Sequence, residues 1–233
     1  MASGTIASLR RAVEEAGSPK GVAKRYERGS EEFSRTLALS DGVFAIAMTL
    51  LVVGIALPTI DNSGSSSEML DALDDLSGSF ISFFISFAVI ARYWAAHQEQ
   101  FSMLARMDRG FVGLNLVYLA FIALLPFPTD LLGNYFENPI SITVYATNVG
   151  IISGMEVVLF RKAYRADLLT ASMPEDVYRW GVVGASSPVV VFMLSIPVAF
   201  LSTTAAAAVW LLTIPVGVLL HRLEPTETLE YLR

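Results

Sequence analysis

The feature that most constrains this chain is an apolar run of about 20 residues with a polar start. Residues 35–58 read RTLALSDGVFAIAMTLLVVGIALP, so Arg35 and the pair Ser40-Asp41 precede a stretch whose one further polar side chain is Thr49. A helix needs about 20 residues to cross a bilayer core of about 30 Å. The run is therefore predicted to be a membrane-spanning helix, and charge at the end of such a helix commonly has a task.

Composition extends this prediction to the whole chain. Hydrophobic residues make up 54% of the 233 residues and charged residues 16%, against roughly 45–50% and 25% in soluble domains. An all-α membrane protein is expected, with a tail at 1–34, a six-helix membrane domain at 35–222 and a second tail at 223–233. The approximate spans are 39–58, 77–97, 111–132, 140–160, 181–201 and 204–222. Prolines 126, 128, 188, 197 and 215 are expected to bend or end helices.

The charges between the spans predict the orientation of the chain. All 16 Lys and Arg residues lie in the first tail, in or beside the loops after spans two and four, or after span six. The other three loops, TIDNSGSSSEMLDALDDL, GNYFEN and ST, contain none. Because Lys and Arg favour the cytoplasmic side, a multi-pass protein of the cell membrane with both termini cytoplasmic is predicted. The Arg35–Asp41 end of span one then faces the cytoplasm.

Other classes of function find little support in the residues. The chain has no Cys and two His, and it lacks a GxSxG motif, so neither an enzyme nor a metal site is expected. The net charge is −6 and the basic residues are not gathered on a soluble face, so no nucleic-acid partner is expected. Glu156 lies close to Arg161 and Lys162 and is interpreted as interfacial.

Periodicity along span one leaves its role open. Ile46, Leu50, Val53 and Leu57 recur at helical spacing as a single stripe. Periodicity alone favours an ordinary packing or lipid-facing surface over a pore. Ser40-Asp41 is compatible with a simple helix cap.

A second polar cluster lies at the same predicted level, at the end of span two. There Trp94 and His97 stand three residues apart and are expected to share a face. Each has an ordinary explanation alone, as an aromatic-belt and an interfacial residue. Together with Asp41 they favour a polar contact between spans one and two.

These residues resemble a known family. Arg-x-x-x-Phe-Ser-Asp followed by an apolar Val-Phe-Ala-Ile-Ala-x-Thr-Leu-Leu run is typical of the transmembrane protein 175 family of potassium channels. Here the pattern reads Arg35, Leu39, Ser40, Asp41 and then GVFAIAMTLLV, and a Trp-x-x-His near the end of span two matches Trp94 and His97. Leu39 replaces the family Phe, which keeps an apolar side chain but loses the ring.

The resemblance implies a homotetramer in a lipid bilayer, with a central pore lined by the first span of each subunit. It places a constriction at Ile46, a hydroxyl layer at Thr49, and further pore positions at Leu50 and Val53. The permeant ions are K+ and other monovalent cations, with modest selectivity for K+ over Na+ and no cofactor. The resemblance also implies that a polar network holds the pore helix against span two outside the ion path. Its members are Arg35, Ser40, Asp41, Trp94 and His97.

Two other functions remain open at this point. A secondary transporter is expected to have internal repeats and broken helices, whereas the two halves show no evident similarity and span one has no predicted break between Gly42 and Leu57. A non-conducting membrane scaffold needs no pore at all. The channel prediction rests on the resemblance, and the membrane topology rests on the residues themselves.

Overall fold

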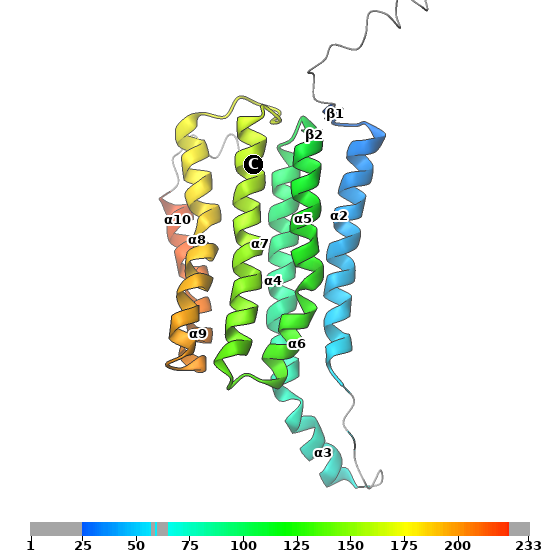
Figure 1. Ribbon diagram of the computed structural model, residues 1–233, viewed down its shortest axis with the longest axis vertical. Coiled ribbons are helices and arrows are strands. Elements are labelled where there is room, and N and C mark those ends of the chain that lie inside the picture. Colours follow the sequence, from blue (N-terminus) through cyan, green and yellow to red (C-terminus); the bar gives the residue numbers. More distant parts are fainter. Residues whose placement is uncertain (1–24, 57–58, 60–64, 224–233) are drawn as a thin grey trace, which may run out of the picture.

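The computed structural model describes residues 25–56, 59 and 65–223, as a bundle of helices that stand side by side (Figure 1). Six helical segments in this part are long and apolar enough to cross a membrane. They run over Glu31–Gly54, Ser77–Ser102, Arg109–Asn134, Pro139–Arg165, Glu175–Ala199 and Thr203–Leu220. Each overlaps one predicted span in order, so the prediction of a helical protein with six candidate spans is confirmed for the described residues.

Several spans consist of more than one element. In chain order the elements are β1 (Arg25–Glu27), α2 (Glu31–Leu50), the 3₁₀-helix η1 (Leu51–Gly54), α3 (Ser66–Asp75), α4 (Ser77–Ser102), β2 (Arg106–Asp108), α5 (Arg109–Leu124), α6 (Pro126–Asn134), α7 (Pro139–Arg165), α8 (Glu175–Ala199), α9 (Thr203–Trp210) and α10 (Thr213–Arg222). Span three is thus α5 followed by α6, and span six is α9 followed by α10. α8 continues through Pro188 and Pro197.

The first span begins earlier than its hydropathy predicts. α2 starts at Glu31, because the side chain of Ser30 accepts a hydrogen bond from the Phe33 N–H at 3.2 Å and Glu31 and Glu32 complement the helix dipole. At its other end the regular α-helix stops at Leu50 and tightens into η1. The uninterrupted helix predicted from Gly42 onward is therefore wrong beyond Leu50, and Leu57 lies outside the described residues.

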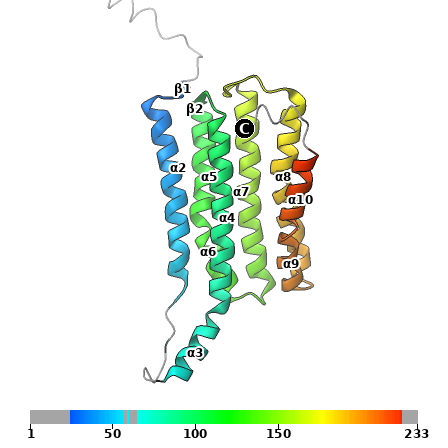
Figure 2. The same cartoon turned by 180° about the vertical axis from the view of Figure 1, so that it is seen from behind.

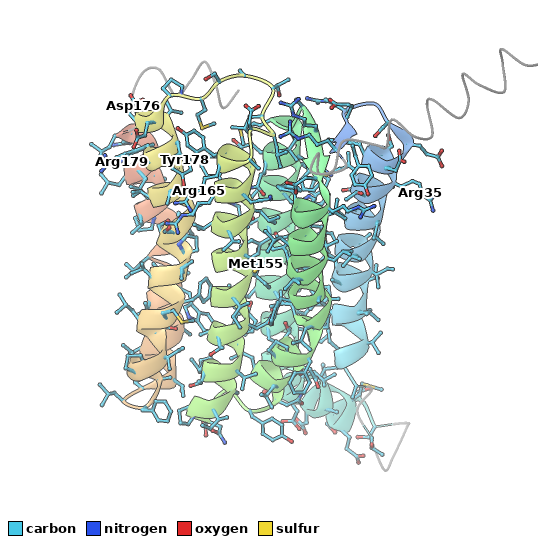
Figure 3. All side chains as sticks on the ribbon, turned by 45° about the horizontal axis from the view of Figure 1, so that its top comes forward. Arg35, Met155, Arg165, Asp176, Tyr178 and Arg179 are labelled. Carbon is cyan, nitrogen blue, oxygen red and sulfur yellow. The ribbon has the colours of Figure 1, made fainter. Side chains whose placement is uncertain are left out.

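A small sheet links the first described residues to the loop between spans two and three. β1 pairs with β2 in antiparallel register, with Tyr26 opposite Met107. Strands of three residues carry no periodic pattern, and the sequence did not predict them. β1 lies at one end of the bundle, α10 runs toward that same end, and Figure 3 shows Arg35, Arg165 and Arg179 there as well. The two described chain ends thus lie toward one end of the bundle.

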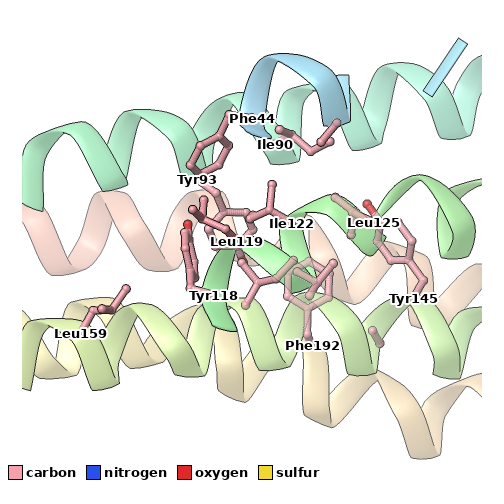
Figure 4. Packing of buried hydrophobic residues seen from close by; sticks show 14 of the residues in the cluster. Phe44, Ile90, Tyr93, Tyr118, Leu119, Ile122, Leu125, Tyr145, Leu159 and Phe192 are labelled. Atoms are coloured by element: carbon pink, nitrogen blue, oxygen red, sulfur yellow. The ribbon is translucent and has the colours of Figure 1, made fainter. Parts of the chain in front are cut away.

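The core is a continuous cluster of apolar side chains at the contacts between helices. Phe44 of α2, Tyr93 of α4 and Tyr118 of α5 lie close together in it (Figure 4). Tyr145 of α7 belongs to the same cluster and is fully buried. α2 lies at one edge of the bundle and α8 to α10 lie at the other in both views (Figures 1 and 2), while α3 projects beyond the end opposite β1. One face of α2 is consequently free of contacts within the subunit.

Candidate functional site

The stripe on span one faces away from the rest of the subunit. Ile46 is 59% exposed, Leu50 44% and Val53 73%. Thr49 is exposed too, and its hydroxyl donates to the Ile46 carbonyl at 2.9 Å. These residues form an apolar surface with one hydroxyl-bearing position, and the other elements that the structure describes leave it largely exposed.

A second stripe fastens α2 to the bundle. Ser40, Phe44, Ala47 and Leu51 recur at spacings of four, three and four, and each is 3% exposed or less. Residues at this spacing share one side of a helix. The buried stripe sets the rotation of α2 and thereby turns the Ile46 stripe outward.

Asp41 ties α2 to α4 near the middle of α2, ten residues after its start at Glu31. Its Oδ1 accepts a hydrogen bond from Trp94 Nε1 at 3.0 Å and another from Gln98 Nε2. Trp94 and Gln98 are one turn apart on α4, so both donors reach the same carboxylate. Both hydrogen bonds are accepted by Oδ1, and no cation among the described residues lies within ion-pair distance of the carboxylate.

Ser40 makes a separate and deeper link. Asn115 of α5 donates from Nδ2 to Ser40 Oγ at 3.0 Å, and its Oδ1 lies 3.0 Å from His97 Nε2. All three side chains are buried, and the Ser40 hydroxyl donates back to the Thr36 carbonyl. Three helices thus meet at one amide.

The aromatic neighbours of His97 complete this contact. Its ring stacks on Phe101 with centroids 4.1 Å apart and meets Phe44 edge to face at 5.4 Å. No hydrogen-bond partner is found for His97 Nδ1 among the residues that the structure describes. The ring is held mainly by apolar surfaces, as in a packed core.

The structure brings together four of the five residues predicted to form the polar network. Ser40, Asp41, Trp94 and His97 connect α2 to α4, directly or through Asn115. Arg35 lies apart from them: it is exposed and pairs with Glu31 one turn earlier on α2 at 3.7 Å. Residues six apart are separated by about 240° around a helix, so Arg35 and Asp41 point in different directions. In the subunit the inclusion of Arg35 in this network is therefore corrected.

Sequence reasoning missed Gln98 and Asn115. Gln98 lies four residues after Trp94, and that spacing could have identified it. Asn115 gives no comparable signal, because its role depends on how α5 crosses α2. Trp94 and His97, predicted to share a face, diverge: Trp94 is 42% exposed and His97 is 1% exposed.

The described residues contain no group of three or more His, Cys, Asp or Glu side chains placed to hold a metal ion. What they form is a polar clamp near the middle of α2 and an exposed apolar stripe that follows it along the first span. Six apolar helices with this arrangement define the class: a multi-pass membrane protein whose first helix is anchored on one side and bare on the other.

Comparison with known proteins places the chain within this class. A family model described as the endosomal/lysosomal potassium channel TMEM175 matches residues 35–126. A potassium channel of Chamaesiphon minutus is 37% identical over 146 residues, which cover 60% of this chain and 70% of that protein. A potassium channel of Streptomyces collinus is 41% identical over 106 residues, 46% of this chain. The chain matches half the length of the Streptomyces relative.

A solved structure agrees with these matches. The crystal structure of a lysosomal potassium-selective channel TMEM175 homolog from Chamaesiphon minutus superposes with a TM-score of 0.67 at 28% sequence identity. The superposition covers 82% of this chain and 99% of that one. The chain belongs to the TMEM175 family, as a member of its prokaryotic type.

Proposed function

We propose that this protein is a potassium-permeable channel whose pore is lined by α2 from four copies of the chain. The observation that carries the proposal is the exposure of Ile46 and Leu50 on α2 and of Val53 on η1, on the face of the first span that the described part of its own subunit leaves bare. The relatives named as potassium channels support the permeant ion. Four copies around a closed rotation axis bring four such faces together.

The constriction follows from the side chains at this face. Four Ile46 side chains around an axis close the path by dewetting, because an ion does not lose its hydration shell where nothing replaces it. A slight widening admits a partly dehydrated ion, and K+ loses water more readily than Na+. Thr49 supplies hydroxyl oxygens one turn away. We therefore propose modest selectivity for K+ over Na+.

The polar clamp has a supporting role in this proposal. Asp41 accepts hydrogen bonds from Trp94 and Gln98, and Ser40 accepts one from Asn115. These bonds hold α2 in the rotation that exposes Ile46. We propose that the end of the bundle toward which both described chain ends run is cytoplasmic in a multi-pass protein of the cell membrane. The clamp lies about ten residues into α2 from that end. The clamp then positions the pore helix, and ions do not bind to it.

The channel is tested by recording the purified protein in planar bilayers with K+ and Na+ on opposite sides. We expect a reversal potential displaced toward that of K+, and Ile46→Asn should raise conductance and weaken selectivity because a polar ring wets the constriction. The matched control is Ile81→Asn on α4, where the same side chain is 60% exposed. A reversal potential at zero contradicts K+ preference, and equal effects of the two variants contradict the pore position. Absence of current at every voltage favours the non-conducting scaffold.

A secondary transporter is the second candidate, because spans three and six are both broken. α5 gives way to α6 at Pro126, and α9 gives way to α10 after Trp210. Interrupted helices at matching places in two halves are typical of transporters. Flux that saturates with ion concentration and shows counterflow would favour this candidate, whereas flux that follows the electrochemical gradient at single-channel rates favours the channel.

A further inference from the structure

A cavity of about 180 Å³ lies between α4, α7 and α8. Its lining residues come from α4 and its C-terminal cap, from α7 and from α8, and none comes from α2. Three charged residues line it: Arg92 and Glu99 from α4, and Glu156 from α7. The channel proposal uses none of them.

Glu156 lies deeper than its sequence position indicates. It was interpreted as interfacial, but α7 continues nine residues beyond it to Arg165, which is about 13 Å along a helix. Arg92 lies ten residues before the end of α4 at Ser102. Glu156 is half-buried, whereas Arg92 and Glu99 are exposed on α4. Ionisable side chains within a membrane-spanning helix are rare and commonly mark a functional site.

No ion pair within 4.0 Å joins the three charged residues of the cavity. The ion pairs in the described part of the chain join Arg35 to Glu31, Arg106 to Asp167 and Lys162 to Asp108. None joins Arg92 to Glu99 or Glu156. The carboxylate of Glu156 accepts one long hydrogen bond, from the Tyr118 hydroxyl at 3.4 Å. Arg92, Glu99 and Glu156 therefore line one cavity without forming an ion pair with one another.

The α8 wall of the cavity leaves room for a ligand. Small residues in a membrane helix usually bring another helix close, and Gly181 follows that rule, since a Cβ there would lie 2.9 Å from the Phe160 ring. Gly184 does not bring another helix close, because a Cβ there would meet no atom within 4 Å. The wall at Gly184 faces the open cavity, whose volume equals that of about six waters at about 30 Å³ each.

We propose that this cavity binds a small zwitterion, a molecule with an ammonium group and a phosphate or carboxylate group a few bonds apart. The ammonium lies against Glu156 and Glu99, and the anionic group takes the planar donors of Arg92, which suit phosphate and carboxylate oxygens. A few charged groups in a largely apolar pocket between helices are the usual form of a small-molecule site. A ligand with both charges satisfies all three residues at once.

The same chemistry can come from two sources, a phosphatidylethanolamine headgroup or free phosphoethanolamine. The test measures thermal unfolding of the purified full chain with each probe, and with phosphatidylglycerol, which lacks the ammonium. We expect one or both ethanolamine probes to raise the Tm by about 5 °C near saturation. If the Tm rises with phosphatidylethanolamine alone, the ligand is a lipid of the bilayer. If the Tm rises with both probes, the cavity also binds free phosphoethanolamine. No rise with either, or an equal rise with phosphatidylglycerol, overturns the proposal.

Substitutions then locate the effect. Arg92→Gln and Glu156→Gln should each weaken the response at least about tenfold, since each removes a charge-assisted contact. Gly184→Leu should abolish it by filling the cavity without changing any charge. Gly217→Leu is the matched control, because Gly217 is exposed on α10 and a Cβ there also meets no atom within 4 Å. If the Tm of Gly184→Leu, or of both Arg92→Gln and Glu156→Gln, rises as much as that of the wild type, the ligand does not bind in this cavity. The readout is independent of ion conduction.

Discussion

Asn115 joins three helices through one side-chain amide, and its replacement should be costly. Asn115→Leu leaves the Ser40 hydroxyl and His97 Nε2 without this partner in a buried site. An unsatisfied buried polar group costs about 1–3 kcal/mol, so we expect a Tm about 5–10 °C lower. Asn134→Ala on the exposed end of α6 is the control, because its amide bonds only to Asp130 in its own turn. An equal fall in Tm in the two variants would contradict the role of Asn115 in joining the three helices.

Asp108 makes the stability of the β2–α5 junction depend on pH. Burial acts to raise the pKa of its carboxyl, but the Lys162 ammonium at 2.7 Å and the backbone N–H groups of Phe111 and Gly110 outweigh it, and the pKa lies below its ordinary value. A depressed pKa contributes stability that is fully present above the unfolded value of about 4 and is lost as pH falls through the folded value.

This gives a test in the acid range. The wild-type Tm should fall below about pH 4, and Asp108→Asn should lower the Tm at pH 7 while making the acid loss shallower. Thermal unfolding between pH 7 and pH 3 measures both slopes, and parallel curves for wild type and Asp108→Asn would exclude this carboxyl as their cause.

At the scale of elements, the crossing of α4 and α6 depends on Gly133. A Cβ there would lie 2.5 Å from Ser82 Oγ and 3.0 Å from the Ser79 Cα. Overpacking of this kind costs about 1–3 kcal/mol, so Gly133→Ala should lower the Tm by several degrees. Gly113→Ala on α5 should have the opposite sign, because no atom lies within 4 Å of that Cβ and Ala favours a helix by up to about 1 kcal/mol. Equal Tm values for the two variants would contradict this packing.

The same elements show what sequence patterns predict well. The six spans follow from length and hydropathy, and Ser30 with Glu31 carries a recognisable helix-start signal that would have moved the first boundary. The turn into η1 after Leu50 has no such signal, since no Pro or Gly precedes it there. A methyl on Gly54 would lie 3.1 Å from Asp130 Oδ1, so the geometry of this turn depends on the neighbouring α6.

At the scale of the whole molecule, the proposed assembly can be tested with a single engineered thiol. The chain has no cysteine, so Val53→Cys introduces one thiol per subunit. If four copies place α2 around the pore axis, oxidation should link subunits in pairs on a non-reducing gel. Ile214→Cys is the control, because this 66% exposed residue lies on α10 at the other edge of the bundle. Cross-linking of Ile214→Cys but not of Val53→Cys would place a different face at the centre.

The residues alone were sufficient to predict a membrane protein, the number of its candidate spans, and an apolar stripe that follows polar residues in span one. These properties depend on hydrophobicity and helical spacing along the chain, which need no knowledge of neighbours. The tertiary structure decided which side of α2 is bare, which amide reaches Ser40, and why Arg35 stands apart. It also decided that Arg92 and Glu156 share a cavity. Each of these depends on which helix faces meet, because a side chain finds its partner through packing between segments far apart in the chain.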